Sequence, residues 1–261
     1  LDEQIPRSAP DALRYEPGVY VQQTAHGQAS PFIRGHTGQQ TLLMFDGIRL
    51  NNSTSRKGPN QYFFTVDAQT VHSIEVTRGG ASTRYGSAAI GGVLDAKPVG
   101  PRTHLGQGGV FLHPRAAFRA ATADSEYGYR VQLGGQLDER VHFLVGGGSR
   151  HLGMLESGGP VVSPQTGEPP QVPAFAADGR TQLGTGFREM TADGRLIYDL
   201  SPRRRLLAAA YLYRQFDAPR TDKCPPPFAP RSECLTYEEQ FRTLAYLRYE
   251  DDLGGAARLV R

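Results

Sequence analysis

The sequence of 261 residues has no tryptophan and only two cysteines. It has no run of about 20 apolar residues, the length that a membrane-spanning helix needs. Its first residues, Leu1-Asp2-Glu3-Gln4, lack the basic start and the apolar stretch of a signal peptide. A spanning helix is thereby excluded. A spanning barrel is not, because barrel strands alternate apolar with polar residues and average out as mildly polar.

Catalytic motifs are absent as well. The sequence has no His-Glu-x-x-His, no Gly-x-Ser-x-Gly and no glycine-rich phosphate loop ahead of a helix. The two thiols have no histidine nearby that could complete a tetrahedral metal shell. We therefore expect no enzyme activity, no catalytic residue, no metal site and no cofactor.

Charge gives no sign of a nucleic-acid partner. The formal net charge is +3, and the lysines and arginines are spread among acidic residues, so they form no stripe that could follow a phosphate backbone. Cys224 and Cys234 lie in a proline-rich segment that resembles a loop. They form either a disulfide in an oxidising compartment or two free thiols, and we expect the disulfide.

The residues that are abundant favour β structure. The chain has 31 glycines and 19 prolines beside 12 tyrosines and 12 phenylalanines, which suits strands joined by turns better than helix bundles. Its character changes near residues 97–101, where a compact mixture of short elements gives way to repeated alternating segments. We predict a small α/β domain at 1–98 and antiparallel strands at 99–261.

Strict alternation marks the second part. From Tyr127 to Leu137 every second residue is tyrosine, valine, leucine or glycine, and the residues between them are mostly glycine, glutamine and arginine. Similar segments begin near residues 106, 140, 187, 204 and 239, and a seventh starts at Ala256. A strand of a membrane barrel needs an apolar face toward the lipid and can have a polar face toward the lumen. The alternative is a half-solvated sheet of a soluble protein.

The connections between these segments alternate in length. Tight turns are expected at 138–139, 201–203 and 251–255, and longer loops at about 120–126, 151–186 and 217–238. An outer-membrane barrel shows this pattern, with short periplasmic turns and long external loops. The sequence therefore predicts an up-and-down transmembrane sheet.

Three separated blocks in the first 98 residues now allow a comparison. They are IRG at 33–35, TLLMFDGIRL at 41–50 and IEVTRGGASTRYGSAAIGGVL at 74–94. In order and spacing they resemble the plug of TonB-dependent outer-membrane receptors. The resemblance implies a bacterial outer-membrane location and a barrel of 22 strands, of which six or seven are readable, so we expect the chain to be part of a longer receptor.

The resemblance also assigns roles to two arginines. In the family, the arginines of these motifs lock the plug to acidic side chains on the barrel wall, and Arg34 and Arg78 are the matching residues. A guanidinium group suits such a bidentate, half-buried pairing. The partner carboxylates are expected on strands beyond Arg261. The alternative is that both are ordinary surface arginines.

Two plug loops are expected, by resemblance, to face an external ligand. Amides, hydroxyls and a cation there could bind an oxygen-rich or anionic solute, and an aromatic ring could stack on it. The alternative is that these loops are merely solvated. The candidate ligand-binding residues are Gln28, Ser30, Asn51, Asn52, Ser55, Arg56, Asn60, Gln61 and Tyr62.

The function implied by the resemblance is energised import of a scarce nutrient. A small extracellular solute, such as a siderophore, a cobalamin or another metal chelate, binds outside. TonB, with ExbB and ExbD, then pulls on the plug from the periplasm. Either a TonB-contacting segment lies upstream of Leu1, or coupling to TonB is lost. The alternative is an outer-membrane binding or adhesion protein that displays long loops without transport.

Overall fold

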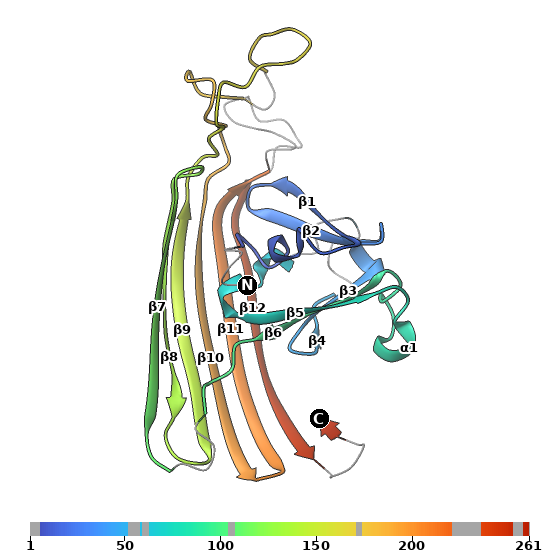
Figure 1. Ribbon diagram of the computed structural model, residues 1–261, viewed down its shortest axis with the longest axis vertical. Coiled ribbons are helices and arrows are strands. Elements are labelled where there is room, and N and C mark those ends of the chain that lie inside the picture. The colour runs from blue at the N-terminus through green and yellow to red at the C-terminus, as the bar shows by residue number, and fades with distance from the viewer. Residues whose placement is uncertain are drawn as a thin grey trace.

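The computed structural model describes residues 6–51, 58, 63–103, 108–170, 174–220, 236–252 and 258–260. The chain is mostly β. Its strands form a two-stranded sheet, a four-stranded sheet and a seven-stranded sheet. The two small sheets lie against one face of the large one, which rises beside them as a tall curved wall (Figure 1).

The two small sheets come from the first 98 residues. They contain β1 (Val19–Ala25), β2 (Gln28–Ile33), β3 (Thr41–Phe45), β4 (Ile48–Arg49), β5 (Val71–Arg78) and β6 (Gly92–Pro98). In the larger of the two, β3 pairs in parallel with β6 and antiparallel with β4. Helical structure is limited to α1 (Ser82–Tyr85) and short 3-10 turns such as Ala68–Thr70.

A compact apolar core holds these sheets together. Ile33, Leu94 and Phe63 are fully buried in it, beside Leu43 and Ala96. Continuous apolar strands such as β3 are expected where both faces of a strand are covered. We call this unit the plug.

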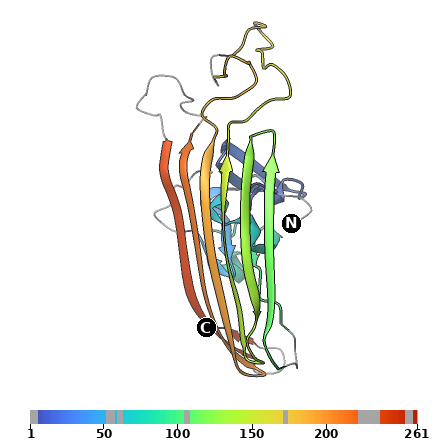
Figure 2. The same cartoon turned by 90° about the vertical axis from the view of Figure 1, so that its left-hand side faces the viewer.

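The seven-stranded sheet, which we call the wall, follows the chain order without a crossover. Its strands are β7 (Phe111–Ala121), β8 (Glu126–Gln136), β9 (Val141–Leu152), β10 (Phe187–Ser201), β11 (Arg204–Pro219), β12 (Thr236–Asp252) and β13 (Arg258–Val260). All neighbours are antiparallel, as the alternating sequence predicted (Figure 2). The boundary expected after residue 98 lies between β6 and β7, and as a division into domains it stays a prediction.

The wall has two faces of opposite character. Tyr127, Tyr129 and Val131 of β8 are each more than half exposed on the outer face. Between them, Arg130 and Gln132 are buried on the inner face, toward the plug. This is the predicted separation of an apolar outer row from a polar inner row, and it argues against a half-solvated soluble sheet, whose outer face would be polar.

The predicted rule of alternating connections holds only in part. The connections at 153–186 and 220–235 are long, and 202–203 is tight, as expected. The first connection, at 122–125, is as short as the turn at 137–140, so its prediction as a longer loop was wrong. The connection is short because strand pairing continues up to Ala121 and Glu126, which leaves only four residues for the turn.

The glycine pair at 91–92 shows close backbone approach inside the plug. A Cβ on Gly92 would lie 2.3 Å from the carbonyl oxygen of Thr77, and one on Gly91 would lie 2.3 Å from the Cβ of His36. Gly92 also has a φ of +151°, which L side chains rarely adopt. None of the helices in the described part of the chain has the length and hydropathy to span a membrane.

The two faces of the wall lead to a prediction. Val131→Asp would place a carboxylate on the apolar outer face and should lower the free energy of unfolding in lipid by about 1–3 kcal/mol. Ala117→Asp is the matched control, because Ala117 is the cross-strand partner of Arg130 on the inner face. Denaturant titration of the whole protein in bilayers measures both. Equal losses in the two variants would contradict the assignment of the faces.

Candidate functional site

The candidate site is the contact between the plug and the inner face of the wall. Its centre is the turn between β3 and β4, where Phe45 pairs with Ile48 and only Asp46 and Gly47 lie between. Both turn residues have positive φ, at +52° and +78°. Asp-Gly is a favoured pair for a two-residue hairpin turn of this kind. The turn directs the carboxylate of Asp46 at the wall.

Three wall side chains surround that carboxylate. Its Oδ2 lies 2.9 Å from Nη1 of Arg195 on β10 and 3.2 Å from Nη2 of Arg248 on β12. The hydroxyl of Tyr246, also on β12, donates a hydrogen bond to the same oxygen. The Asp46 and Arg195 side chains are each only 10% exposed. We call these four residues the Asp46 lock.

The lock keeps Asp46 ionised. Burial alone would raise its pKa, but the hydrogen bond from Tyr246 and the positive charges of Arg195 and Arg248 outweigh burial, so its pKa lies below the ordinary value. A buried carboxylate is stable only when paired in this way. The charge state of Asp46 therefore depends on the wall.

Aromatic packing surrounds the ion pairs. The rings of Phe45 and Tyr211 meet edge to face at 4.7 Å, and Tyr211 stacks on Tyr246 at 6.5 Å. The hydroxyl of Tyr211 also lies 3.1 Å from Nη1 of Arg195 and accepts its hydrogen bond. These rings exclude water from the lock and strengthen its charge interactions.

A second contact lies beside the 3-10 turn at Ala68–Thr70. Asp67 accepts a hydrogen bond from the backbone N–H of Gln69 at 2.9 Å, and its other oxygen lies 3.4 Å from Nη1 of Arg130. Arg130 also pairs with Asp193 inside the wall. Arg242 donates a hydrogen bond to the hydroxyl of Thr65 at 2.6 Å. Here again the plug supplies acceptors and the wall supplies cations.

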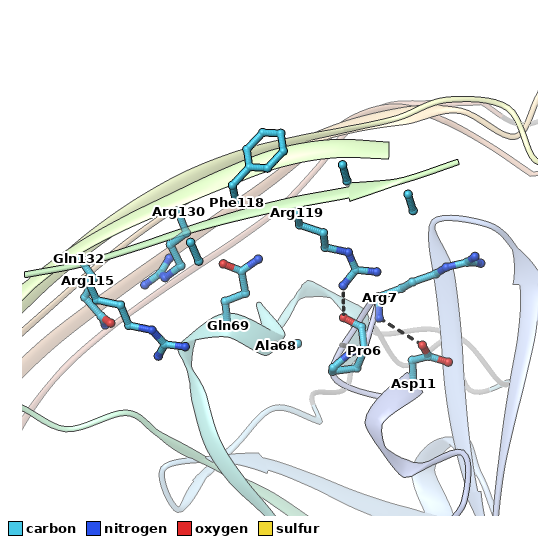
Figure 3. A pocket seen from close by; sticks show the side chains of 13 residues that line it. Pro6, Arg7, Asp11, Ala68, Gln69, Arg115, Phe118, Arg119, Arg130 and Gln132 are labelled. Carbon is cyan, nitrogen blue, oxygen red and sulfur yellow. Dashed lines mark hydrogen bonds between the residues drawn. The ribbon is translucent and has the colours of Figure 1, made fainter. Parts of the chain in front are cut away.

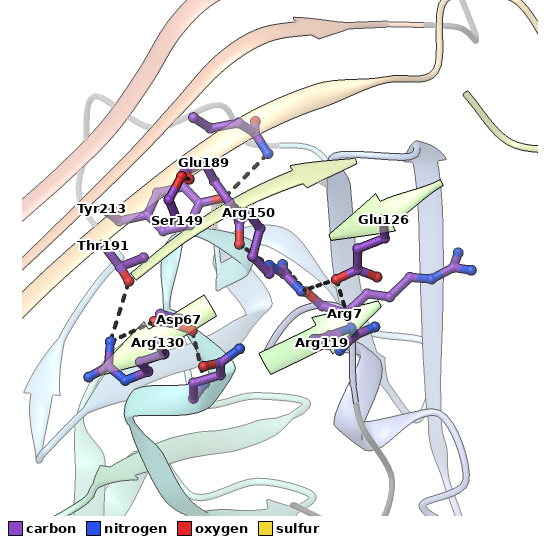
Figure 4. Close-up of polar contacts among 12 residues, drawn as sticks. Arg7, Asp67, Arg119, Glu126, Arg130, Ser149, Arg150, Glu189, Thr191 and Tyr213 are labelled. Atoms are coloured by element: carbon purple, nitrogen blue, oxygen red, sulfur yellow. Dashed lines mark hydrogen bonds and ion pairs between the residues drawn. The ribbon is translucent and has the colours of Figure 1, made fainter. Parts of the chain in front are cut away.

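A third contact uses only backbone atoms of the plug. Arg119 and Arg150 donate hydrogen bonds to the carbonyls of Pro6 and Arg7, at 2.9 and 2.7 Å. Glu126 lies between the two wall arginines, 2.7 Å from Arg119 and 3.2 Å from Arg150 (Figure 4). The wall thus holds the backbone of Pro6 and Arg7, and the Arg7 side chain adds an ion pair with Asp124 at 3.7 Å.

The structure places the two predicted locking arginines elsewhere. Arg78 pairs with Glu16 of the plug at 3.0 Å, with both side chains partly exposed. Arg34 is exposed, has a φ of +50°, and its guanidinium lies beside Gly79. Their pairing with acidic residues on further strands stays a prediction. At Asp46 and Asp67 the polarity is the reverse, with plug acids facing wall arginines, whereas plug Arg7 lies 3.7 Å from Asp124 of the connection between β7 and β8.

The predicted ligand-binding residues divide into three groups. Gln28 and Ser30 are buried within β2, with 2% and 0% of their surface exposed. The side chain of Asn51 bridges backbone groups of Leu43 and Thr41. Their ligand-binding role stays a prediction, although these environments suit structural roles. The remaining candidates lie outside the described residues, as do both cysteines: Asn52, Ser55, Arg56, Asn60, Gln61, Tyr62, Cys224 and Cys234.

The Asp46 lock was missed from the sequence, where Asp46 was only the first residue of a turn. The sequence did carry one signal for the lock. Arg195 and Arg248 stand at positions of the alternating strands whose side chains face inward. Within the described part of the chain, no group of three or more histidines, cysteines or acids could hold a metal ion. The site is therefore built from ion pairs and hydrogen bonds.

The lock can be tested by a double-mutant cycle. Asp46→Asn and Arg195→Gln should each lower the free energy of unfolding by about 3–5 kcal/mol, because each leaves a buried partner uncompensated. The double variant should lose clearly less than the sum. Denaturant titration of the whole protein measures all three. Asp217→Asn is the control, since its pair with Arg188 is more than 60% exposed on both sides and should contribute only about 0–1 kcal/mol.

The lowered pKa of Asp46 sets the direction of a pH effect. A depressed carboxyl pKa contributes stability that is fully present above the ordinary value, near 3.8, and is lost as the pH falls through the folded-state value. The wild type should therefore lose more stability than Asp46→Asn when the pH is lowered below about 4. Unfolding titrations at pH 7, 4 and 3 measure the difference. Parallel losses in both proteins would show that Asp46 is not ionised in the lock.

Comparison with known proteins now adds to the geometry. Residues 1–93 match the model of the TonB-dependent Receptor Plug Domain family. The vitamin B12 transporter BtuB of Photobacterium profundum is 36% identical over 90 residues, which are 34% of this chain and 14% of that protein. The hemin receptor of Yersinia pestis is 31% identical over 153 residues, which are 58% of this chain and 22% of that protein.

Solved structures share the fold across nearly the whole chain. The ferric enterobactin receptor PfeA of Pseudomonas aeruginosa matches with a TM-score of 0.64 at 20% identity, over 97% of this chain and 37% of that one. The copper transporter OprC matches with a TM-score of 0.69 at 13% identity, over 96% of this chain and 33% of that one. The chain thus spans about a third of the structures it resembles.

These similar proteins are receptors and transporters rather than enzymes, as the sequence predicted. The plug motifs, the plug seated on a two-faced wall and the shared fold agree with one another. Residues 1–93 are identified as the plug domain of the TonB-dependent receptors, which are proteins of the outer membrane, and the whole chain is similar in fold to solved receptors.

Proposed function

We propose that the receptor of which this chain is part binds a small extracellular nutrient and imports it into the periplasm with energy transmitted by TonB. The observation that carries the proposal is the seating of the plug on the inner, polar face of a wall whose outer face is apolar. A plug in that position closes a lumen, and import then requires that it move or open. ExbB and ExbD are the expected partners of TonB in that step.

The outer ends of the wall supply a surface for a ligand. The long connection at 153–186 extends beyond the strands on the side away from the turns at 137–140 and 202–203 (Figure 1). Part of it is ordered by its own contacts, since Arg180 and Glu156 pair at 3.1 Å and Thr181 and Asp178 share a side-chain hydrogen bond of 2.6 Å. An ordered loop presents a defined surface to a solute at low entropic cost.

The similar proteins suggest which solutes to test. Their names specify vitamin B12, hemin, ferric enterobactin and copper. The vitamin B12 transporter and the hemin receptor match at similar identities, 36% and 31%, so identity does not select between their solutes. We therefore propose the class, a scarce nutrient such as a metal chelate, rather than one compound.

The proposal predicts uptake that depends on TonB. A strain without its own receptors, carrying the full-length gene, should accumulate one labelled solute from a panel of cobalamin, hemin, ferric catecholates and copper salts. Accumulation should fall to background when the tonB gene is deleted or the proton gradient is collapsed. Surface binding should persist in both cases.

Two outcomes would contradict this function. Uptake that survives the loss of TonB would exclude energised transport. Binding of ligands or cells without uptake, under every condition, would favour the alternative of an outer-membrane binding or adhesion protein.

A further inference from the structure

The hairpin of β1 and β2 lies level with the ends of the wall strands from which the connection at 153–186 extends (Figure 1). Its turn is buried against the wall. Gln215 of β11 is buried and donates a hydrogen bond to the carbonyl of Gly27 at 3.0 Å. A Cβ on Gly27 would lie 2.9 Å from Nε2 of Gln215 and 3.3 Å from the ring of Phe187. The turn is therefore fitted closely to β10 and β11.

His26, beside Gly27, contacts two connections of the wall at once. Its Nδ1 lies 3.0 Å from the backbone carbonyl of Thr185, near the end of the connection at 153–186. Because a carbonyl oxygen can only accept, Nδ1 donates this hydrogen bond. Its Nε2 lies 3.3 Å from Oδ2 of Asp124, in the connection between β7 and β8. The side chains of His26 and Asp124 are only 1% and 0% exposed, so the contact lies in the interior of the protein.

Asp124 and Thr185 also hold the long connection itself. The backbone carbonyl of Asp124 accepts a hydrogen bond at 2.7 Å from the N–H of Gly153, where the connection begins. The hydroxyl of Thr185 accepts one at 2.8 Å from the N–H of Leu155 and donates one at 2.9 Å to the carbonyl of Gln182. Two residues that contact the plug turn thus also fasten both stems of the connection.

The ring of His26 packs against the base of the same connection. It meets the ring of Phe187 edge to face at 5.5 Å. Phe187 is buried with Leu152 and Ala218, and it pairs across the strands with Leu152, the last residue before the connection. Removal of His26 would therefore uncover apolar surface at the base and leave the Thr185 carbonyl without its donor. Both changes are unfavourable.

A second segment of the plug also reaches Asp124. The side chain of Arg7 lies 3.7 Å from its Oδ2. The position of Arg7 is fixed in turn, because its backbone N–H bonds to Asp11 at 3.1 Å and the neighbouring carbonyl of Pro6 accepts from Arg119 at 2.9 Å (Figure 3). The stems of the connection are thus supported from two places in the plug.

We propose that His26 couples the order of the connection at 153–186 to the seating of the plug. With the plug seated, His26 holds the Thr185 carbonyl and covers the base of the connection. A plug that moves away takes this donor with it, and the connection loosens at its stems. One consequence rests on the proposed function: the plug movement that import requires also releases the connection, so that the plug and a loop on the outer side change together.

Hydrogen exchange of the full-length receptor measures the coupling without transport. His26→Leu removes the donor, whereas His26→Asn keeps one at the same number of bonds from Cβ as Nδ1. In His26→Leu the stem peptides 153–157 and 180–185 should exchange about five- to a hundredfold faster than in the wild type. In His26→Asn they should stay closer to the wild type. Rates are taken relative to the peptide 128–134 of β8.

His36→Leu is the matched control, because the ring of His36 bonds to Gln40 within the plug at 3.1 Å. It should leave the stem peptides unchanged. Unchanged exchange of both stems in His26→Leu would overturn the coupling. An equal increase in the peptide of β8 would also overturn it, because the whole protein would then have loosened rather than the connection.

A second arm leaves His26 in place and loosens the plug at the separate Asp46 lock. In Asp46→Asn both stem peptides should exchange faster relative to β8, because the plug leaves the wall more often. A purely local role of His26 would not produce this response, and its absence would overturn the coupling. In the His26→Leu background Asp46→Asn should add little. An equal response in the two backgrounds would show that His26 does not carry the coupling.

Uptake and coupling can fail separately. If the receptor shows no TonB-dependent uptake, the proposed function fails, and the exchange rates still decide whether His26 couples the connection to the plug. If uptake depends on TonB and the stem peptides respond to neither substitution, the function stands and the coupling fails.

Discussion

Asp46 is a buried carboxylate at the tip of a two-residue turn, and the wall provides the charges that stabilise it. The turn has both φ angles positive, so its direction is fixed by the plug backbone. Arg195 and Arg248 lie on strands β10 and β12, which β11 separates. Because both guanidinium groups must reach one carboxylate, the height of the plug along the wall and its rotation against the wall are fixed together.

Two further contacts follow the same division of charge, whereas the pair of plug Arg7 with Asp124 reverses it. Plug acids and plug carbonyls face wall arginines at the lock, at Asp67 and at Pro6 and Arg7. A wall that carries its cations inward can hold a plug through polar contacts while its outer face stays apolar for lipid. Polar contacts would also suit the plug movement that the proposed import requires, since water can replace them when they open. Contacts to the plug come from both ends of the described wall, from Arg119 and Arg130 on β7 and β8 and from Arg195 and Arg248 on β10 and β12.

Local pattern was enough to predict the fold. Alternation in β8, from Tyr127 to Gln136, has a period that no helix shares, and the motif around 74–94 is long and specific. The turn at 122–125 was misjudged because turn length depends on where strand pairing stops, and the pairing of Ala121 with Glu126 is not visible in composition. The Asp46 lock was beyond prediction because its partners are about 150 and 200 residues away along the chain. Arg34 and Arg78 were predicted as locking residues from a sequence motif. Arg195 and Arg248, which bind Asp46, lie in strands that carry no such motif.

The most direct measurement is an experimental structure of the full-length receptor in a lipid or detergent environment, at a resolution that shows side chains. The account predicts that the plug lies inside the barrel and that the Asp46 carboxylate contacts Arg195, Arg248 and Tyr246 on the inner face. An Asp46 side chain surrounded by water, or a plug that contacts the wall chiefly through β7 and β8, would contradict it.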